Sequence, residues 1–228
     1  MIYVAAIVVA AGKGTRFNSK IPKPLVKLEG QAVIMHSLAV LSRHPDIKEI
    51  IVVVNPSNRG GILKSIEKSA VKKIKALVLG GARRQDSVAY GLRAVSQDAS
   101  HVLIHDAARP LIEANKISAA INAAKKSGGA VLGVPVKDTI KAVDKKNFVK
   151  KNIDRSNLWA IQTPQVFKKE LIFRAYKKFT KATVTDDASL VEKLGKNVSV
   201  VFGSYDNIKI TTPEDLLIAQ AIIKFRKR

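Results

Sequence analysis

The chain of 228 residues contains no cysteine. A disulfide framework, a thiolate nucleophile and a cysteine-based metal site are therefore excluded. Without disulfides, and with no run of about 20 consecutive apolar residues of the kind that crosses a membrane, we expect a cytoplasmic protein with no membrane span. The apolar segment 2–11 (IYVAAIVVAA) lacks the basic region of a signal peptide and leads directly into a glycine turn, so it is interpreted as a buried first strand.

Acidic and aromatic residues are both scarce. The chain has 18 Asp and Glu against 40 Lys and Arg, a net charge of +22, and 5% aromatic residues. Such an excess of positive charge is typical of nucleic-acid-binding proteins. However, the basic residues are spread along the chain as lysine pairs, and no nucleic-acid-binding motif is found. We therefore expect a solvated, lysine-rich surface that favours encounter with a small polyanion, and nucleic-acid binding is the remote alternative.

Short apolar runs alternate with stretches of helical periodicity along the chain. The predicted strands are Val4–Ala10, Glu49–Val54, Ile74–Leu79, His101–His105, Gly129–Val134 and Val198–Phe202. The predicted helices are Val33–Arg43, Gly61–Ser69, Gln85–Val95, Ala114–Lys126, Lys169–Phe179 and Pro213–Phe225. This alternation predicts an α/β fold: a single domain over residues 1–228 with a mostly parallel, Rossmann-like sheet and helices on both faces.

Residues 136–163 interrupt the alternation, because they are polar, rich in lysine and without helical periodicity. Two β-like segments, Thr139–Val143 and Phe148–Ile153, flank a turn-like Asp-Lys-Lys-Asn sequence. They predict a protruding β-hairpin arm over residues 137–158. Because an isolated hairpin is marginally stable in water, we expect the arm to pack against something outside its own subunit; a mobile surface excursion is the alternative.

The segment VVAAGKGTRFNSKIPKPL (residues 8–25) follows the first strand. It matches neither the GxGxxG dinucleotide fingerprint nor the GxxxxGK[ST] phosphate loop, since Phe17 stands where each motif requires glycine. What remains is a turn of exposed N–H groups with Arg16 and Lys23. A guanidinium binds phosphate oxygens bidentately and an ammonium adds a point charge, so the turn suits a triphosphate. A tight turn with incidental cations is the alternative.

Two aspartates are candidates for a metal site. Asp106, in HDAARP (105–110), follows the apolar VLI at the end of a probable central strand, and Asp206 precedes Asn-Ile-Lys. A carboxylate that faces a triphosphate requires a cation between them, and hard oxygen ligands indicate Mg²⁺. A helix N-cap is the alternative role for Asp106. None of the four histidines is a convincing base: His105 neighbours Asp106, but strand alternation directs the two side chains to opposite faces.

The segment AAGKGTRF…PK resembles the signature loop of nucleotidyltransferases of the sugar-nucleotide pyrophosphorylase type. Six further segments, in order along nearly the whole chain, resemble the 2-C-methyl-D-erythritol 4-phosphate cytidylyltransferase family of the non-mevalonate isoprenoid pathway. They are GGARRQDSV (80–88), HDAARP, PVKDTIK (135–141), DRSNLWAIQTPQVF (154–167), TDDASL (185–190) and DNIKITTPEDL (206–216). HDAARP with DNIKIT also fits the related ribitol-5-phosphate cytidylyltransferases.

This resemblance implies a function for each matching residue. The nucleotide CTP would be bound by Ala10, Ala11, Gly12, Gly14, Arg16, Lys23, Gly81 and Ser87. The polyol phosphate and the metal would be bound by Asp106, Arg109, Thr139, Arg155, Thr185, Asp206 and Lys209, with Arg16, Lys23 and Lys209 as the catalytic cations. Many relatives carry an acidic or polar residue after Gly81, where this chain has Ala82. A helix N-cap is the compatible alternative for Ser87. Asp186 and Asp187 are interpreted as acids at a helix N-terminus.

The resemblance also implies a reaction and an assembly. CMP would pass from CTP to 2-C-methyl-D-erythritol 4-phosphate, with release of pyrophosphate; ribitol 5-phosphate is the alternative acceptor. Since the attacking phosphate is already an anion, catalysis would consist of alignment and charge neutralisation, assisted by Mg²⁺. The arm would cross to a second copy of the chain and deliver Arg155, so a homodimer is expected.

Overall fold

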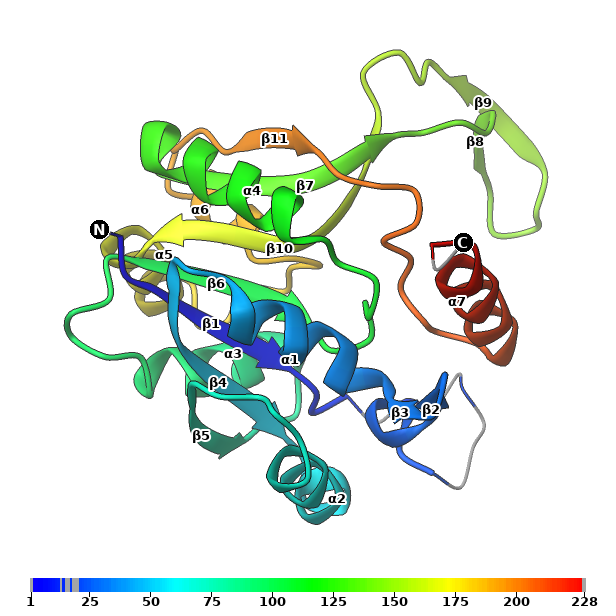
Figure 1. Ribbon diagram of the computed structural model, residues 1–228. Coiled ribbons are helices and arrows are strands. Elements are labelled where there is room, and N and C mark those ends of the chain that lie inside the picture. The colour runs from blue at the N-terminus through cyan, green and yellow to red at the C-terminus, as the bar shows by residue number, and fades with distance from the viewer. Residues whose placement is uncertain (1, 13, 15–16, 18–20, 227–228) are drawn as a thin grey trace.

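The computed structural model of the chain describes residues 2–12, 14, 17 and 21–226. A twisted sheet of seven strands runs through the centre of this described part (Figure 1). Its strands are β1 (Val4–Val9), β4 (Ile47–Val54), β5 (Ile74–Leu79), β6 (His101–Asp106), β7 (Gly129–Pro135), β10 (Trp159–Lys168) and β11 (Ser199–Phe202).

The strand order is β11-β7-β10-β6-β1-β4-β5. Strand β1 pairs in parallel with β4 and β6, whereas β10 lies antiparallel between β6 and β7. Six strands therefore share one direction, and their carboxyl ends meet at one edge of the sheet. The prediction of a mostly parallel α/β sheet is confirmed, and ligands of such sheets bind at the edge where the carboxyl ends meet.

Helices cover both faces of the sheet (Figure 1). They are α1 (Val33–Arg43), α2 (Pro56–Glu67), α3 (Arg84–Arg93), α4 (Ala114–Ser127), α5 (Lys169–Lys178), α6 (Ala188–Glu192) and α7 (Pro213–Arg226). Alternate residues of β1 separate two cores: Val4, Ala6 and Val8 pack with α1, α2 and α4, while Ala5 and Ile7 pack with α3, α5 and α6. All five side chains are fully buried, which explains why the strand reads as a continuous apolar run.

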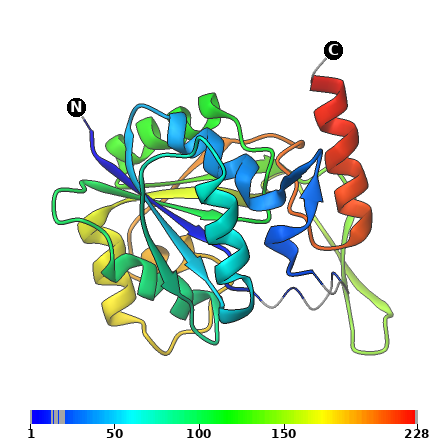
Figure 2. The ribbon, with the colours of Figure 1, turned by 60° about the horizontal axis from the view of Figure 1, so that its bottom comes forward.

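A third, smaller core attaches the C-terminal helix near the carboxyl edge. The 3₁₀ turn η2 (Lys23–Leu25) leads into a two-stranded ribbon of β2 (Lys27–Leu28) and β3 (Gln31–Ala32). Leu28, Ile210 and Ala219 are buried together there, and both views show α7 beside the ribbon (Figures 1 and 2).

The predicted hairpin is present and projects from the body of the molecule (Figure 2). It consists of β8 (Ile140–Val143) and β9 (Val149–Ile153), which pair antiparallel with each other and not with the main sheet. Phe148 and Val149, near its tip, are 68% and 62% exposed. The tip of the arm thus presents two large apolar side chains to solvent.

Several elements differ from the sequence prediction: the short strands β2 and β3 and the short helix α6 were not predicted, and β10 and α2 differ as well. Strand β10 was not predicted, because its first three residues are exposed and Pro164 interrupts its pattern. Helix α2 begins at Pro56 and not at Gly61: the side chain of Asn55 accepts from the Asn58 N–H, and the Asn58 side chain accepts from the Asn55 N–H, so the turn-like residues form a capped first turn. In the described part of the chain, no helix is both long and apolar enough to span a membrane.

Candidate active site

A cleft of about 870 Å³ opens at the carboxyl edge of the sheet. Its walls come from the turn after β1, the start of α2, the turn before α3, the end of β6 and the segment before α7. Predicted residues that line it are Ala10, Ala11, Gly12, Gly14, Lys23, Gly81, Ser87, Asp106 and Lys209. Residues distant in the sequence thus meet where the topology places a ligand site.

The turn after β1 is held by the start of α2. Asn58 Nδ2 donates to the Ala10 carbonyl at 2.8 Å, and Asn55 Nδ2 donates to the Ala11 carbonyl at 3.2 Å. Gly14 has a φ of +65°, a left-handed conformation that favours glycine. Arg16, predicted to bind the triphosphate, lies outside the described residues.

The second glycine turn packs directly against the first. A Cβ on Gly80 would lie 2.3 Å from the Ala11 Cβ, so only glycine permits this approach. The Gly81 N–H donates to Ser87 Oγ at 3.1 Å, and Ser87 Oγ donates to the Arg83 carbonyl. Ser87 lies inside α3, whose N-cap is Arg83, so the N-cap alternative for Ser87 is wrong.

Asp106 ends β6 with its carboxylate between two cations. Lys209 Nζ lies 2.6 Å from Oδ2, and Arg84 Nε donates to Oδ1 at 3.2 Å. Burial favours the protonated acid, but the charges of Arg84 and Lys209 outweigh it and hold the pKa of Asp106 well below its usual range. Asp106 is therefore an ionised carboxylate at the floor of the cleft.

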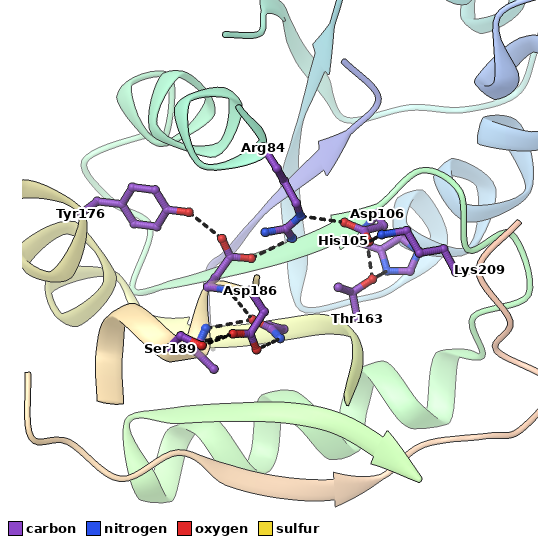
Figure 3. Close-up of polar contacts among 11 residues, drawn as sticks. Arg84, His105, Asp106, Thr163, Tyr176, Asp186, Ser189 and Lys209 are labelled. Atoms are coloured by element: carbon purple, nitrogen blue, oxygen red, sulfur yellow. Dashed lines mark hydrogen bonds and ion pairs between the residues drawn. The ribbon is translucent and has the colours of Figure 1, made fainter. Parts of the chain in front are cut away.

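Arg84 also reaches away from the cleft, to a second carboxylate (Figure 3). Its Nη2 donates to Asp187 Oδ2 at 2.8 Å, and Tyr176 OH donates to Asp187 Oδ1 at 2.5 Å. Burial opposes the charge on Arg84, but the two carboxylates outweigh it and raise the Arg84 pKa above its ordinary value. Arg84 thus joins the cleft to the buried core between α3, α5 and α6.

His105 has a structural role, as predicted from strand alternation. Its Nε2 lies 3.0 Å from the Arg109 carbonyl and its Nδ1 3.1 Å from Thr163 Oγ1, which accepts from the Asp106 N–H. Complete burial lowers the pKa of His105 to about 4. A neutral imidazole that donates from Nε2 and accepts at Nδ1 satisfies these contacts and fixes the loop after β6.

Arg109 lies beside the cleft without lining it. Its Nη1 donates to the Asn207 carbonyl at 2.7 Å, while its buried Nε has no hydrogen-bond partner in the described part of the chain. Burial lowers the Arg109 pKa, and Asp106 counteracts this effect.

Four other predicted residues are not brought to the cleft of this single chain. Thr139 and Arg155, at the base of the arm, and Thr185, before α6, are exposed. Asp206 accepts from Arg226 Nη2 at 3.0 Å, so its carboxylate pairs with the C-terminal helix rather than joining Asp106. Among the described residues, no group of three or more His, Cys, Asp or Glu side chains could hold a metal ion. The structure therefore gives no support to the predicted pairing of Asp106 and Asp206 on one ion.

Sequence reasoning missed Arg84, Asn55, Asn58 and Asp187 as contributors to the site. Arg84 lies within the quoted GGARRQDSV segment, so the segment identified the region but not the residue. The asparagines follow β4, and their position at the carboxyl end of a strand was the available signal.

Comparison with known proteins agrees with this geometry. Residues 4–225 match the model of the family described as IspD, 2-C-methyl-D-erythritol 4-phosphate cytidylyltransferase. The chain belongs to this family. Proteins with the same name from Alkaliphilus oremlandii and Pelotomaculum thermopropionicum are 46% and 43% identical over 98% of this chain and 96% and 95% of theirs.

A solved structure of 4-diphosphocytidyl-2C-methyl-D-erythritol synthase from Anaerococcus prevotii superposes with a TM-score of 0.87 at 34% identity, covering 98% of this chain and 96% of that one. As a member of the 2-C-methyl-D-erythritol 4-phosphate cytidylyltransferase family, the chain is a nucleotidyltransferase with a Rossmann-like fold.

Proposed function

We propose that the chain transfers CMP from CTP to 2-C-methyl-D-erythritol 4-phosphate in isoprenoid biosynthesis. The products are 4-diphosphocytidyl-2-C-methyl-D-erythritol and pyrophosphate. The observation that carries this proposal is the cleft at the carboxyl edge: the described residues of the turn after β1 and Lys23 line it together with the Asp106 carboxylate, which pairs with Arg84 and Lys209. The names of the relatives, which include this acceptor, support its choice over ribitol 5-phosphate.

The reaction joins two polyanions. A phosphate oxygen of the acceptor attacks the α-phosphorus of CTP, a new P–O bond forms, and the bond to the β-phosphate oxygen breaks in line with it. The bonding electrons leave on pyrophosphate. Because the attacking phosphate oxygen is already an anion, no proton has to be removed from the nucleophile. The protein must hold the two phosphates together and stabilise the charge that develops on the leaving oxygens.

Each group of residues has a place in this scheme. CTP is held by the turn of Ala10, Ala11, Gly12 and Gly14 with Arg16 and Lys23, and its base lies against Gly81 and Ser87. The acceptor phosphate is held by Lys209, with Arg109, Thr139, Arg155, Thr185 and Asp206 as further ligands or supports. The ammonium groups of Lys23 and Lys209, both at the cleft wall, neutralise phosphate charge.

A divalent cation fits one part of this site. Mg²⁺ commonly binds one or two carboxylates together with substrate phosphates, and Asp106 offers an ionised carboxylate at the cleft floor. We propose that Asp106 holds Mg²⁺ with the CTP phosphates. When bound, the ion supplies Lewis-acid stabilisation of phosphate charge. Lys209 and Arg84 keep the Asp106 carboxylate oriented toward the cleft.

The arm is proposed to form a homodimer. Thr139 and Arg155 are exposed and do not reach the cleft of their own chain, and the arm tip presents Phe148 and Val149 to solvent. Seating the arm on a second copy would cover these apolar side chains and complete that copy's acceptor site. Sedimentation velocity of the intact chain should give a dimer, and deletion of residues 138–157 should give a folded monomer; a monomer of the intact chain at micromolar concentration contradicts the proposal.

The deciding experiment measures pyrophosphate release with CTP and MgCl₂. Methylerythritol phosphate and ribitol phosphate are offered in separate reactions, and ATP, GTP and UTP replace CTP as controls. Release with methylerythritol phosphate and CTP alone supports the proposal. Turnover with ribitol phosphate only would assign the other acceptor, and no turnover with either would refute both.

A further inference from the structure

Arg84 is the only described residue that contacts both buried carboxylates near the cleft. Its Nε donates to Asp106 and its Nη2 to Asp187, so the guanidinium bridges the cleft floor and the core. Nη1 makes no hydrogen bond to the described residues. The side chain is 28% exposed and lines the cleft. Arg84 therefore has donors left for a ligand.

Asp187 is fully buried and held from several sides. Tyr176 OH donates to one carboxylate oxygen, and Gln165 Oε1 accepts from the Asp187 N–H at 3.1 Å and from the Ala188 N–H at 3.0 Å. Burial and the neighbouring Asp187 raise the Tyr176 pKa, so the phenol keeps its proton and remains a donor. Asp187 is thus a fixed, buried acceptor for Arg84 that does not line the cleft.

The two carboxylates differ in what they can do for Arg84. Asp106 faces the cleft, and any cation that binds with the nucleotide competes with Arg84 for its oxygens. Asp187 has no exposure to the cleft solution and cannot be taken by such a cation. A guanidinium anchored on Asp187 keeps its position whichever partner Asp106 has.

We propose that Asp187 and Tyr176 form a positioning pair that holds the Arg84 guanidinium at the cleft wall, where it binds the triphosphate of the nucleotide. This inference rests on the proposed function, because it requires CTP in the cleft. The pair touches no substrate itself and acts through Arg84. An arginine fixed in advance loses less conformational freedom when it binds phosphate.

A double-mutant cycle separates this role from a purely structural one. Asp187→Asn and Tyr176→Phe are each made in the wild-type chain and in an Arg84→Gln chain. We measure kcat, the KM values for CTP and for the acceptor, and CTP affinity by calorimetry with MgCl₂. Loss of a supporting partner typically lowers activity or affinity about 10- to 100-fold.

We expect Asp187→Asn to weaken CTP binding about 10-fold and Tyr176→Phe about 3-fold, with the acceptor KM unchanged. In the Arg84→Gln chain, both substitutions should change CTP affinity less than about 2-fold, because the group they position is gone. Tyr3→Phe is the matched control: it removes another tyrosine–carboxylate hydrogen bond, from Tyr3 OH to Glu49 Oε2 at 3.1 Å, at the opposite edge of the sheet. Its kinetics should match wild type.

Two results would overturn this inference without contradicting the proposed function. One is undiminished effects of both substitutions in the Arg84→Gln chain, and the other is wild-type CTP affinity in both single variants. If Asp187→Asn does not fold, the Tyr176→Phe cycle decides by the same criteria. Failure of the wild-type chain to bind CTP or release pyrophosphate would instead refute the proposed function.

Discussion

Two buried carboxylates lie at opposite edges of the same sheet, and their surroundings differ. Glu49, near the start of β4, accepts from Tyr3 OH, the Ser96 N–H and Ser96 Oγ, and pairs with one cation, Lys75, at 3.1 Å. Asp106, at the end of β6, pairs with two cations that themselves line a cleft. The first cluster satisfies its charge within the fold. The second cluster keeps its positive groups at a cleft, where a polyanion can reach them. A buried carboxylate with cationic partners is thus suited to stability at the Glu49 edge and to ligand binding at the Asp106 edge.

The largest expected difference between the two edges is in activity. Asp106→Asn removes the charge that pairs with Lys209 and that binds the proposed metal, and kcat/KM should fall about 10²- to 10³-fold, or about 3–4 kcal/mol of barrier. Steady-state pyrophosphate release measures this loss. Glu49→Gln in the same assay should stay within about 2-fold of wild type. Full activity of Asp106→Asn would show that the Asp106 carboxylate is not needed for catalysis.

Acid should affect His105 and Glu49 in different pH ranges. Because the pKa of buried His105 is about 4 in the folded chain against 6.5 for the free group, the unfolded chain binds the proton more readily. Stability is therefore full above pH 6.5 and falls by up to about 3 kcal/mol as the pH drops toward 4. Burial also lowers the pKa values of His44 and His101, which add to the same slope.

Urea unfolding of wild type and His105→Gln between pH 7.5 and 4.5 checks this expectation, and the variant should show the shallower slope. Burial raises the pKa of Glu49, but its hydrogen bonds to Ser96, Lys75 and Tyr3 outweigh this and lower it, so the Glu49 contribution is lost only below the ordinary glutamate pKa of about 4.5. Equal slopes for the two chains would show that His105 is not the acid-sensitive group.

Stability should respond most to the Glu49 cluster at neutral pH. Glu49→Gln keeps the side-chain shape but removes a charged acceptor that is 5% exposed, and the free energy of unfolding should fall by about 1–3 kcal/mol. Chemical denaturation at pH 7 measures the change. If the Glu49→Gln chain is as stable as wild type, or loses catalysis instead, the Glu49 cluster does not have the purely stabilising role expected for it.

The smallest effect is expected at Lys75, whose side chain is 40% exposed. Its ion pair with Glu49 is partly screened by water, and Lys75→Met should cost less than about 1 kcal/mol. The same denaturation measurement resolves it, with added salt reducing the difference. A loss as large as that of Glu49→Gln would mean that the ion pair, and not the neutral donors, holds the cluster together.

The sequence was sufficient for most of the sheet, because buried parallel strands are continuous apolar runs. The strand Ile74–Leu79 and the helix Val33–Arg43 have the predicted bounds. Strand β10 was not predictable in the same way: its first three residues are exposed and the next six are buried, so no single periodicity describes it. Its place between β6 and β7 depends on long-range pairing that local sequence does not encode.

The site shows the same division. Asp106 lies at the carboxyl end of β6, as the rule for ligand sites in such sheets predicted. Lys209, which lies 103 residues later in a second quoted motif, pairs with it in the structure. Arg83 and Arg84 could not be distinguished, since one residue changes the direction of a helical side chain by about 100°. Both arginines line the cleft, but Arg83 turns back to Asp86 at 2.6 Å, while Arg84 reaches Asp106 and Asp187. Only the observed start of α3 determines which arginine is which.

The arm begins and ends on neighbouring strands. Pro135 of β7 and Trp159 of β10 are register partners, and the Val136 N–H donates to the Leu158 carbonyl, so the whole excursion is inserted where a short turn would already join the strands. Its length and surface can therefore diverge, or be exchanged by grafting, while the scaffold beneath stays unaltered. The tip of the arm can therefore change while the sheet is retained, whereas the proposed roles of Thr139 and Arg155 constrain its base.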